Sequence, residues 1–273
     1  MQPVKTVAAF HDLSSVGRCA LTVVMPVISA MGVQVIPAPT AVLSAHTAFP
    51  DFVVKDLTGY LRACTDKWLE MGLTFDCVYT GYFASAAQEE IARGFMEAQP
   101  KAIRVVDPVL GDDGEMYKGM PADMPARMKT LCRGADIITP NLTEAALLTD
   151  QPYFDGEYTM ARLTETLERL MALGPKRALM TGVKLDGANA NAWMAEDGVT
   201  RLCAYRAVPA AYPGTGDLFT SVIAGALTRG DAFEDALPLA TRYVQYTMRE
   251  TLQCGTDPLL GVQLEKTLQE LMR

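Results

Sequence analysis

The feature that most constrains this chain is a regular alternation of short apolar runs with longer segments of helical spacing. Strands that alternate with helices of this length predict βαβ units, and therefore an α/β fold with a mainly parallel sheet covered on both faces. The strand-like runs are KTVAAF (5–10), VQVIP (33–37), FDCVYTGY (75–82), AIRVVDPV (102–109), ADIITPN (135–141), RALMTGV (177–183), ANAWMA (190–195) and TRLCAY (200–205). The helical segments are 51–71, 84–98, 158–173 and 218–229.

Residues 1–273 are expected to form a single domain. No stretch rich in Pro, Gly or Ser divides the chain, and its length fits one large α/β domain. Asp197-Gly198, between the last two strand-like runs, predicts a hairpin. Parallel sheets bind ligands beyond the carboxyl ends of their strands. The polar pairs expected at such ends are His11-Asp12, Gly81-Tyr82, Asp107-Pro108, Pro140-Asn141 and Thr181-Gly182.

Charge and cysteine usage exclude several classes of function. With 24 Lys+Arg against 32 Asp+Glu, the net charge is −8, and no basic cluster offers the positive surface that nucleic acid needs. The six cysteines include no Cys-x-x-Cys pair and only two histidines accompany them, which argues against a zinc cluster and favours reduced thiols. The first residues do not resemble a signal peptide, and no apolar run is long enough to span a membrane. We expect a cytoplasmic protein with neither a nucleic-acid nor a membrane partner.

The stretch Gly214-Thr215-Gly216-Asp217 is the strongest candidate for an active site. An apolar helical face follows it directly, so the glycines lie at a helix N-terminus, where backbone N–H groups can bind an anion. A carboxylate in the same turn suits a base that accepts the proton of an attacking hydroxyl during phosphoryl transfer. The alternative is that Asp217 only caps the helix. The sequence contains no P-loop, no G-x-G-x-x-G after a strand, no G-x-S-x-G and no H-E-x-x-H.

Two further stretches carry acidic or amide groups near expected strand ends. Asp107 follows the run IRVV, and Asp112-Asp113-Gly114 forms a turn from which carboxylates could reach a metal ion or its waters. Turn-forming preference alone also explains these residues. In PNLTE (140–144), Asn141 and Glu144 could act on Mg²⁺ near phosphates, or they could form a capping box at a helix start. Local sequence does not separate the two readings.

SAHTAF (44–49) and TGYF (80–83) mix apolar and polar residues in a way that suits a small aromatic substrate. Tyr82 could stack on a ring, while His46 and Thr47 could form hydrogen bonds with it. A structural role for these side chains is the competing interpretation.

Taken in order, these stretches resemble the pyridoxal kinase branch of the ribokinase-like superfamily. The resemblance spans nearly the whole chain, through AAFHDLSSVG, SAHT, TGYFAS, DPVLGDDGEMY, ITPNLTEA and GTGDLF. It implies a three-layer α/β/α sandwich, usually assembled as a homodimer, that uses ATP and Mg²⁺ to phosphorylate a B6 vitamer. It leaves open whether a monovalent cation such as K⁺ assists.

The resemblance also implies a role for each position. Gly214, Thr215 and Gly216 look like the anion hole, and Asp217 like the base that deprotonates the 5′-hydroxymethyl group of the vitamer. By the same resemblance, Asn141 and Glu144 organise Mg²⁺ and phosphate, partly through water. Asp107 and Thr181 are implied to contact ATP, and His46, Thr47 and Tyr82 to lie beside the substrate.

The chain departs from the branch at Phe10, because many pyridoxal kinases have a pyridine-contacting Ser just before the first-strand His. HDLSSVGRCAL is also similar to the Ser-Asp-Pro-Ser-Gly-Gly region of hydroxymethylpyrimidine kinases, which are the main alternative. Those kinases typically show Ala-Gln-Asn-Thr where this chain has Ser44-Ala45-His46-Thr47. A second alternative is a protein that binds B6 or nucleotide without transferring phosphate, although such a protein has no use for a base at Asp217.

Overall fold

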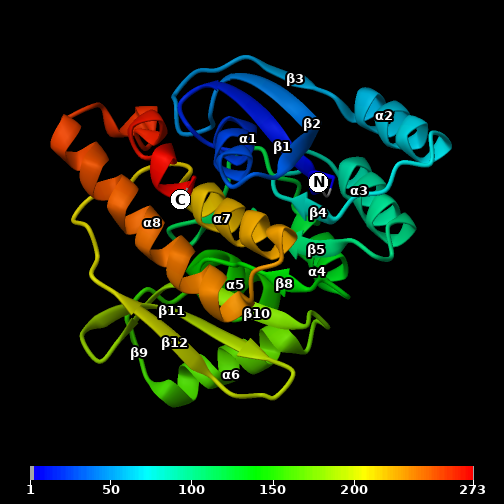
Figure 1. Ribbon diagram of the computed structural model, residues 1–273. Helices are drawn as coiled ribbons and strands as arrows, with labels where there is room; N and C mark the ends of the chain where they lie inside the picture. Colours follow the sequence, from blue (N-terminus) through cyan, green and yellow to red (C-terminus); the bar gives the residue numbers. More distant parts are fainter. Residues whose placement is uncertain (1–2, 273) are drawn as a thin grey trace.

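The computed structural model describes residues 3–272, and one ten-stranded sheet runs through them (Figure 1). Its strand order is β12-β11-β10-β8-β5-β4-β1-β2-β3, and β9 pairs separately with β10. The strands are β1 (Thr6–Val16), β2 (Gln34–Ala45), β3 (Val54–Asp56), β4 (Cys77–Thr80), β5 (Ile103–Val106), β8 (Ile137–Ile138), β9 (Glu157–Tyr158), β10 (Arg177–Leu185), β11 (Ala188–Ala195) and β12 (Arg201–Tyr205). A separate small hairpin joins β6 (Gly111–Asp112) to β7 (Glu115–Met116).

The sheet is mostly parallel, as the alternation of strands and helices predicts. The neighbours from β2 through β1, β4, β5 and β8 to β10 are all parallel, and β9 also pairs with β10 in parallel. Antiparallel pairs occur only towards the two edges, where β3 joins β2 and where β11 and β12 extend β10. The β11–β12 hairpin confirms the turn predicted at Asp197-Gly198.

Helices cover both faces of the sheet, so the molecule has three layers. They are α1 (Leu21–Ala30), α2 (Thr58–Glu70), α3 (Ala86–Ala98), α4 (Met124–Cys132), α5 (Leu142–Thr149), α6 (Met160–Met171), α7 (Thr215–Arg229) and α8 (Phe233–Cys254). Three short 3-10 helices follow: η1 (Pro258–Leu260), η2 (Leu264–Lys266) and η3 (Leu268–Leu271). Within residues 3–272, none of the helices combines the length and the apolar character needed to cross a bilayer.

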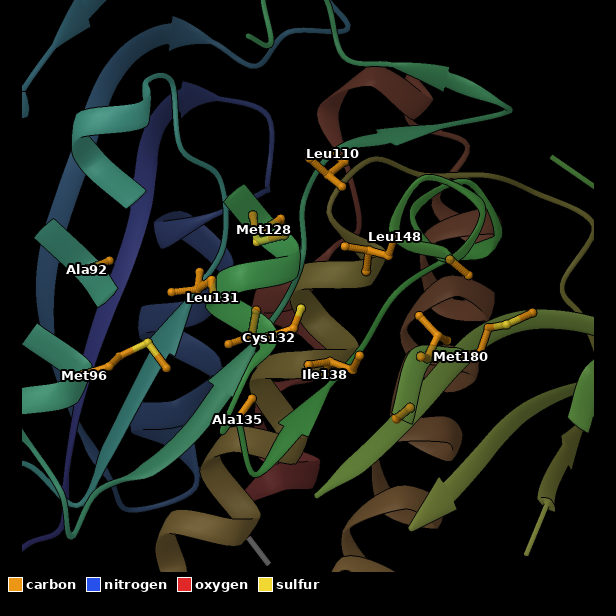
Figure 2. Packing of buried hydrophobic residues seen from close by; sticks show 14 of the residues in the cluster. Ala92, Met96, Leu110, Met128, Leu131, Cys132, Ala135, Ile138, Leu148 and Met180 are labelled. Carbon is orange, nitrogen blue, oxygen red and sulfur yellow. The ribbon is translucent and has the colours of Figure 1, made fainter. Parts of the chain in front are cut away.

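Alternate side chains of the central strands feed two separate cores. On β1, Ala8 and Phe10 pack with α2 to α6, whereas Val7 and Ala9 pack with α1, α7, α8 and the 3-10 helices. Figure 2 shows part of the first core, in which side chains of α3, α4 and α5 meet those of β8 and β10. Because both faces of the sheet are buried, its strands read as continuous apolar runs in the sequence.

Several element boundaries differ from the sequence-based expectation, among them the end of β2, which reaches Ala45 and not residue 37. The helix expected over 51–71 begins only at Thr58, because Val54–Asp56 pairs with β2 as strand β3. Strand β1 continues past His11-Asp12, where its register with β2 shifts between His11 and Leu13. Strand β10 continues past Thr181-Gly182, where a second register shift occurs, so these two residues lie at an irregularity within a strand and not at its end.

Candidate active site

Helix α7 begins with a backbone turn that only glycine fits. Gly214 is the N-cap residue, with φ 77°. A Cβ at this position would lie 2.1 Å from the carbonyl oxygen of Arg18, in the loop between β1 and α1. The first helical hydrogen bond runs from Leu218 N–H to the Gly214 carbonyl (2.9 Å), so the N–H groups of residues 215–217 have no partner within the helix. N–H groups in this arrangement can bind an anion, as the sequence predicts.

The structure rules out the capping interpretation of Asp217. Asp217 lies in the first turn of α7 but is not its cap, and Gly214, which is, contributes no side chain. Instead, Asp217 Oδ2 accepts a hydrogen bond from the Ala20 N–H (2.8 Å). The Asp217 side chain is 16% exposed, and burial raises its pKa to about 7, helped by the nearby Asp12 and opposed by the hydrogen bond from Ala20. A carboxylate with this pKa can accept a proton near neutral pH.

Three adjoining cavities meet at the start of α7. The first has a volume of about 150 Å³, the second about 230 Å³ and the third about 350 Å³. The first and second share Gly214 and Asp217, and the second and third share Thr215 and Gly216. Asp217 therefore lies at the junction of the first two cavities, and the anion-binding N–H groups lie between the second and the third.

The first cavity contains the residues predicted beside a substrate. His46, Thr47 and Tyr82 all line it, together with Asp217. Asp12, from the His11-Asp12 pair expected at a ligand-binding strand end, also lines it. Sequence reasoning missed several other lining residues, which come from β1, the loop after it, β2, the loop after β5 and the residue after β7: Ser14, Cys19, Leu43, Val109 and Tyr117. The polar run DLSS next to His11 was the available signal for Ser14, whose side chain hydrogen-bonds to that of Asp12 at 2.8 Å.

His46 and Phe10, which the sequence analysis singled out, both contact other parts of the protein. His46 Nε2 is 2.7 Å from the Leu259 carbonyl oxygen, and its Nδ1 accepts a hydrogen bond from Ala48 N–H (3.3 Å). The imidazole therefore holds the C-terminal segment against the cavity. Phe10 is fully buried in the core against Phe95, at a ring separation of 5.4 Å, and does not line the cavity. At the position where many pyridoxal kinases have a pyridine-contacting Ser, this chain therefore offers the cavity no side chain, and β1 lines the cavity through His11, Asp12 and Ser14 instead.

The second cavity brings together Asp107, Asn141, Glu144 and Thr181 with Asp217 and residues 214–216. The predicted capping box is present: Asn141 Oδ1 accepts from Glu144 N–H (2.9 Å), and Glu144 Oε2 accepts from Asn141 N–H (2.8 Å). Glu144 Oε1 also accepts from Leu110 N–H (3.1 Å), which fixes the loop after β5. The cap reading is confirmed, and the Mg²⁺ reading stays a prediction.

The lining of the second cavity is acidic. Burial raises the pKa of Asp107 and of Glu144 well above their usual values, and each also responds to another nearby carboxylate, Asp217 for Asp107 and Asp107 for Glu144. No Lys or Arg is among the described residues that line the cavity. Among residues 3–272, no group of three or more His, Cys, Asp or Glu side chains could hold a metal ion. The positive potential here comes from the N-terminus of α7.

The third cavity is a finding of the structure alone. Thr181, which was expected to contact ATP, lines it together with Asp112 and the start of α7. Most of the remaining lining residues come from β11, β12, the loop after β12 and α8, and they include Asn191, Tyr205, Val208, Thr241, Val244, Gln245 and Met248. Its mixture of apolar and amide side chains suits a nucleobase and sugar. No local motif marks these residues, because only the packing of α8 against the sheet edge brings them together.

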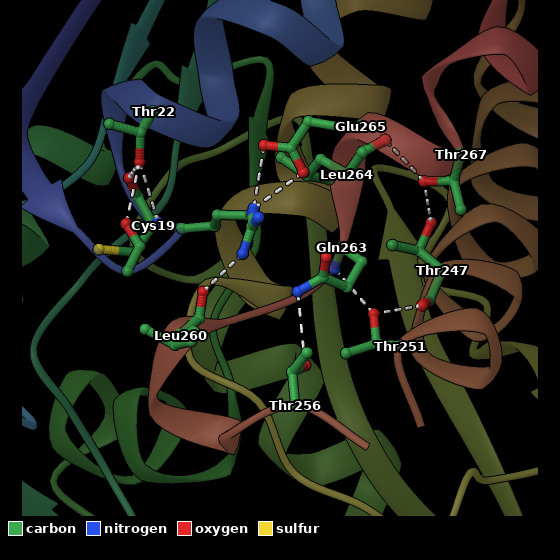
Figure 3. Close-up of polar contacts among 12 residues, drawn as sticks. Cys19, Thr22, Thr247, Thr251, Thr256, Leu260, Gln263, Leu264, Glu265 and Thr267 are labelled. Carbon is green, nitrogen blue, oxygen red and sulfur yellow. Dashed lines mark hydrogen bonds and ion pairs between the residues drawn. The ribbon is translucent and has the colours of Figure 1, made fainter. Parts of the chain in front are cut away.

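The C-terminal segment is fastened to the loop after β1, beside the first cavity (Figure 3). The Arg18 guanidinium pairs with Glu265 (3.0 Å), and both its Nη1 (3.0 Å) and its backbone N–H (3.2 Å) donate to the Leu260 carbonyl. Gln263 N–H donates to Thr251 Oγ1 of α8 (2.8 Å). The segment is thereby held against the loop whose Cys19 and Ala20 line the first cavity, although more than 190 residues separate it from most of the substrate-side residues.

Comparisons with known proteins agree with this geometry. The family model described as phosphomethylpyrimidine kinase matches residues 22–260. A curated pyridoxal kinase from Rubrobacter xylanophilus is 24% identical over 253 residues, which cover 87% of this chain and 84% of that protein.

Two solved structures are similar over almost the whole length. A candidate phosphomethylpyrimidine kinase from Bacteroides thetaiotaomicron, solved with pyridoxal, is 41% identical, with a TM-score of 0.92 and coverage of 99% of this chain and 96% of that one. Pyridoxal kinase from Lactobacillus plantarum is 36% identical, also with a TM-score of 0.92, and the match covers 99% and 97% of the two chains.

Proposed function

This chain belongs to the phosphomethylpyrimidine kinase family, in the pyridoxal kinase branch of the ribokinase-like superfamily, and we propose that it phosphorylates the 5′-hydroxymethyl group of a B6 vitamer with ATP. Pyridoxal, pyridoxamine and pyridoxine are the candidate substrates, and the reaction belongs to the salvage of vitamin B6. One observation carries the proposal: a carboxylate with a pKa of about 7 lies where a substrate-sized cavity meets the anion-binding start of α7.

The arrangement assigns the steps of an in-line transfer to this chain's residues. The vitamer occupies the first cavity, with its ring beside Tyr82 and its hydroxymethyl group towards Asp217. Asp217 accepts the hydroxyl proton as the oxygen bonds to the γ-phosphorus of ATP, and the bond from that phosphorus to the ADP oxygen breaks. The N–H groups of residues 215–217 stabilise the charge on the transferred group, in a site that contains no cationic side chain among its described lining residues.

The same proposal places the nucleotide and its metal ion. ATP occupies the third cavity with its phosphates reaching into the second, where Asp107 and Thr181 lie beside them. Mg²⁺ is usually held by one or two protein oxygens together with substrate phosphates and water, which fits the oxygen-rich second cavity. Asn141 and Glu144 would act on the ion partly through water, because both Glu144 oxygens already accept backbone hydrogen bonds. The resemblance leaves open whether K⁺ assists.

Two alternatives remain distinguishable by experiment. Hydroxymethylpyrimidine is the substrate that the family description suggests, and its six-membered ring has the same size as the pyridine ring of a B6 vitamer. We favour a B6 vitamer because one relative of 36% identity is named pyridoxal kinase and another of 41% identity was solved with pyridoxal. A protein that only binds these ligands would not need a base at the junction of the two cavities.

A coupled assay of ADP release tests the proposal directly. We expect ATP-dependent turnover with at least one of pyridoxal, pyridoxamine and pyridoxine, and a lower kcat/KM with hydroxymethylpyrimidine. A higher kcat/KM for hydroxymethylpyrimidine would transfer the assignment to that substrate. Binding of pyridoxal and ATP by calorimetry, without any ADP release, would identify a non-catalytic protein.

Three further expectations belong to the proposal. A single domain over residues 1–273 is supported by the one continuous sheet, and a cytoplasmic location by the reduced state expected for the cysteines, all six of which are free. A homodimer is supported by three exposed valines at neighbouring ends of the first three strands: Val16, Val53 and Val54. A Val54→Glu variant that stays as dimeric as the wild type in sedimentation would argue against this interface.

A further inference from the structure

A buried histidine with no hydrogen-bond partner lies beside the proposed base. His11 is on β1, its side chain is 1% exposed, and neither Nδ1 nor Nε2 has a hydrogen-bond partner. Its Nδ1 is 4.0 Å from Asp217 Oδ1. Burying an imidazole destabilises the fold when neither ring nitrogen has a partner, because no hydrogen bond replaces those lost to water. The position therefore calls for a function.

The ring of His11 is held in one place by its surroundings. The rings of His11 and Tyr79 pack edge to face, with centroids 4.3 Å apart and an interplanar angle of 73°. On the other side, a Cβ at Gly81 would lie 2.3 Å from His11 Nδ1, so only glycine leaves room for the ring. Gly81 has no positive φ, and the space for the imidazole is therefore what requires a glycine there.

His11 faces the base and not the vitamer. It borders the first cavity, yet its almost complete burial leaves little surface for a ligand to contact. Burial lowers its pKa to about 3, so the imidazole is neutral and carries one N–H near neutral pH. Asp217 Oδ2 is already bonded to Ala20, which leaves Oδ1 as the oxygen on the histidine side.

We propose that His11 is a positioning residue for the transfer, whose Nδ1–H donates to Asp217 Oδ1 once both substrates are bound. This inference rests on the proposed function of Asp217 and extends it to a second residue. Catalytic hydrogen bonds are often long in the free enzyme and tighten in the complex, and a separation of 4.0 Å needs a shift of only about 1 Å to reach hydrogen-bond distance. With Ala20 on one oxygen and His11 on the other, the carboxylate is fixed towards the hydroxyl that it deprotonates.

A pair of substitutions separates this role from packing. His11→Phe keeps a ring against Tyr79 and removes the N–H, whereas His11→Asn keeps an N–H donor and loses the ring. We expect His11→Phe to lower kcat by about 10–100-fold, as loss of a hydrogen bond to a charged group does, with KM for pyridoxal within about twofold. His11→Asn should retain a higher kcat than His11→Phe. If packing alone matters, the ranking reverses, and that result would overturn the proposal.

The pH profile gives a second readout. A donor to the carboxylate lowers the pKa of Asp217 in the substrate-bound enzyme, so its loss in His11→Phe should move the acid limb of kcat upward by about one pH unit. The other titratable groups around this pair include Asp12 on β1, Cys19 in the following loop, Tyr79 on β4, Asp107 after β5 and Tyr117 after β7, and burial raises the pKa of all five. None of these groups is changed in His11→Phe, so an unmoved limb would contradict the proposed hydrogen bond.

Gly81→Ala tests the positioning role of His11 without replacing the histidine itself. It is the alternative test if the histidine variants fail to fold. The added methyl group must displace the imidazole, so kcat should fall and the limb should move as in His11→Phe. The matched control is Gly94→Ala on α3, where a Cβ meets no atom within 4 Å, and we expect wild-type kcat. Wild-type kinetics for Gly81→Ala would refute the positioning role. Turnover by the wild-type chain is measured alongside, so a failure of the proposed function would be recognised separately.

Discussion

Asp217 on α7 and Ala20 in the loop after β1 are joined by a 2.8 Å hydrogen bond, although 197 positions separate them in the sequence. Ala20 has a φ of 48°, a conformation that costs a non-glycine residue of the order of 1–3 kcal/mol. The bond from its N–H to Asp217 compensates part of that strain. The same bond turns one carboxylate oxygen away from solvent and leaves the other towards the cavity, so the strained loop orients the base.

Asp217→Asn should abolish most of the activity with little loss of stability. The amide oxygen can still accept from Ala20 N–H, but it cannot take the hydroxyl proton. We expect kcat to fall by about 10²–10⁴-fold, the usual contribution of general base catalysis. Single-turnover kinetics and thermal melts measure both effects. Asp217→Ala is the comparison: it loses activity equally and also leaves Ala20 N–H unpaired, which should cost about 1–3 kcal/mol. Wild-type turnover in the Asn variant would remove Asp217 from the mechanism.

The raised pKa of Asp217 predicts a pH dependence of both activity and stability. Activity needs the ionised carboxylate, so kcat/KM should rise with pH through an apparent pKa of about 7. The unfolded chain ionises this group near pH 4 and the folded chain only near 7, so the stability that Asp217 contributes falls between these values as pH rises. Denaturant titrations from pH 4 to 8 give the free energy of unfolding of the wild type and of Asp217→Asn, and the difference between the two isolates this contribution. A difference that grows in favour of the wild type with pH would contradict the assigned direction.

The acid limb should also respond to Asp12. Its carboxylate raises the pKa of Asp217, so Asp12→Asn should move the acid limb of kcat/KM to lower pH, whereas His11→Phe should move the acid limb of kcat to higher pH. Rate profiles of the two variants side by side provide the measurement. Shifts of the same sign would show that the limb does not report on Asp217.

Gly214 and Gly216 should differ sharply on replacement by alanine. At Gly214, a side chain meets the Arg18 carbonyl oxygen at 2.1 Å and the φ of 77° is strained, so we expect a loss of stability of about 1–3 kcal/mol or more together with loss of turnover. At Gly216, a Cβ meets nothing within 4 Å, and Gly216→Ala should melt close to the wild type. Equal melting temperatures for the two variants would mean that the turn before α7 is not specified by Gly214.

Tyr82 and Tyr205 should control different substrates. Tyr82 lines the first cavity and Tyr205 the third, so Tyr82→Ala should raise KM for pyridoxal and Tyr205→Ala should raise KM for ATP. Loss of ring contact is worth about 0.5–1.5 kcal/mol beyond buried area, which corresponds to roughly 2–13-fold in each constant. Initial-rate measurements with each substrate varied in turn reveal the pattern. If either variant raised both constants equally, its ring would not belong to one cavity alone.

Asn141 should matter for stability through its cap. Asn141→Ala removes the acceptor for Glu144 N–H and should cost about 0.5–2 kcal/mol, whereas Asn141→Ser can still cap and should lose less. The Mg²⁺ concentration for half-maximal activity, measured on both variants, tests the second role. An Asn141→Ser variant with wild-type stability and an increased Mg²⁺ requirement would separate metal organisation from capping.

Local chemistry made part of this site predictable. Residue type and spacing predicted the glycine turn at the start of α7, because it depends on neighbours in the sequence. The capping box of Asn141 and Glu144 was one of two interpretations that the local sequence left open, and the structure confirms it. The bond of His46 to Leu259 and that of Asp217 to Ala20 were not predictable, because each joins segments about 200 residues apart. The third cavity escaped notice for the same reason, since α8 contributes to it only after packing against the sheet edge.

The attachment of the C-terminal segment to Arg18 and His46 has a consequence for biosynthesis. Residues 257–265 supply the carbonyl groups and the carboxylate that these two side chains hold beside the first cavity. On the ribosome, the N-terminal strands emerge and begin to fold long before this segment is translated. A nascent chain that ends before residue 257 therefore lacks the partners of Arg18 and His46, and these two side chains gain their C-terminal contacts only after the last turns have been translated.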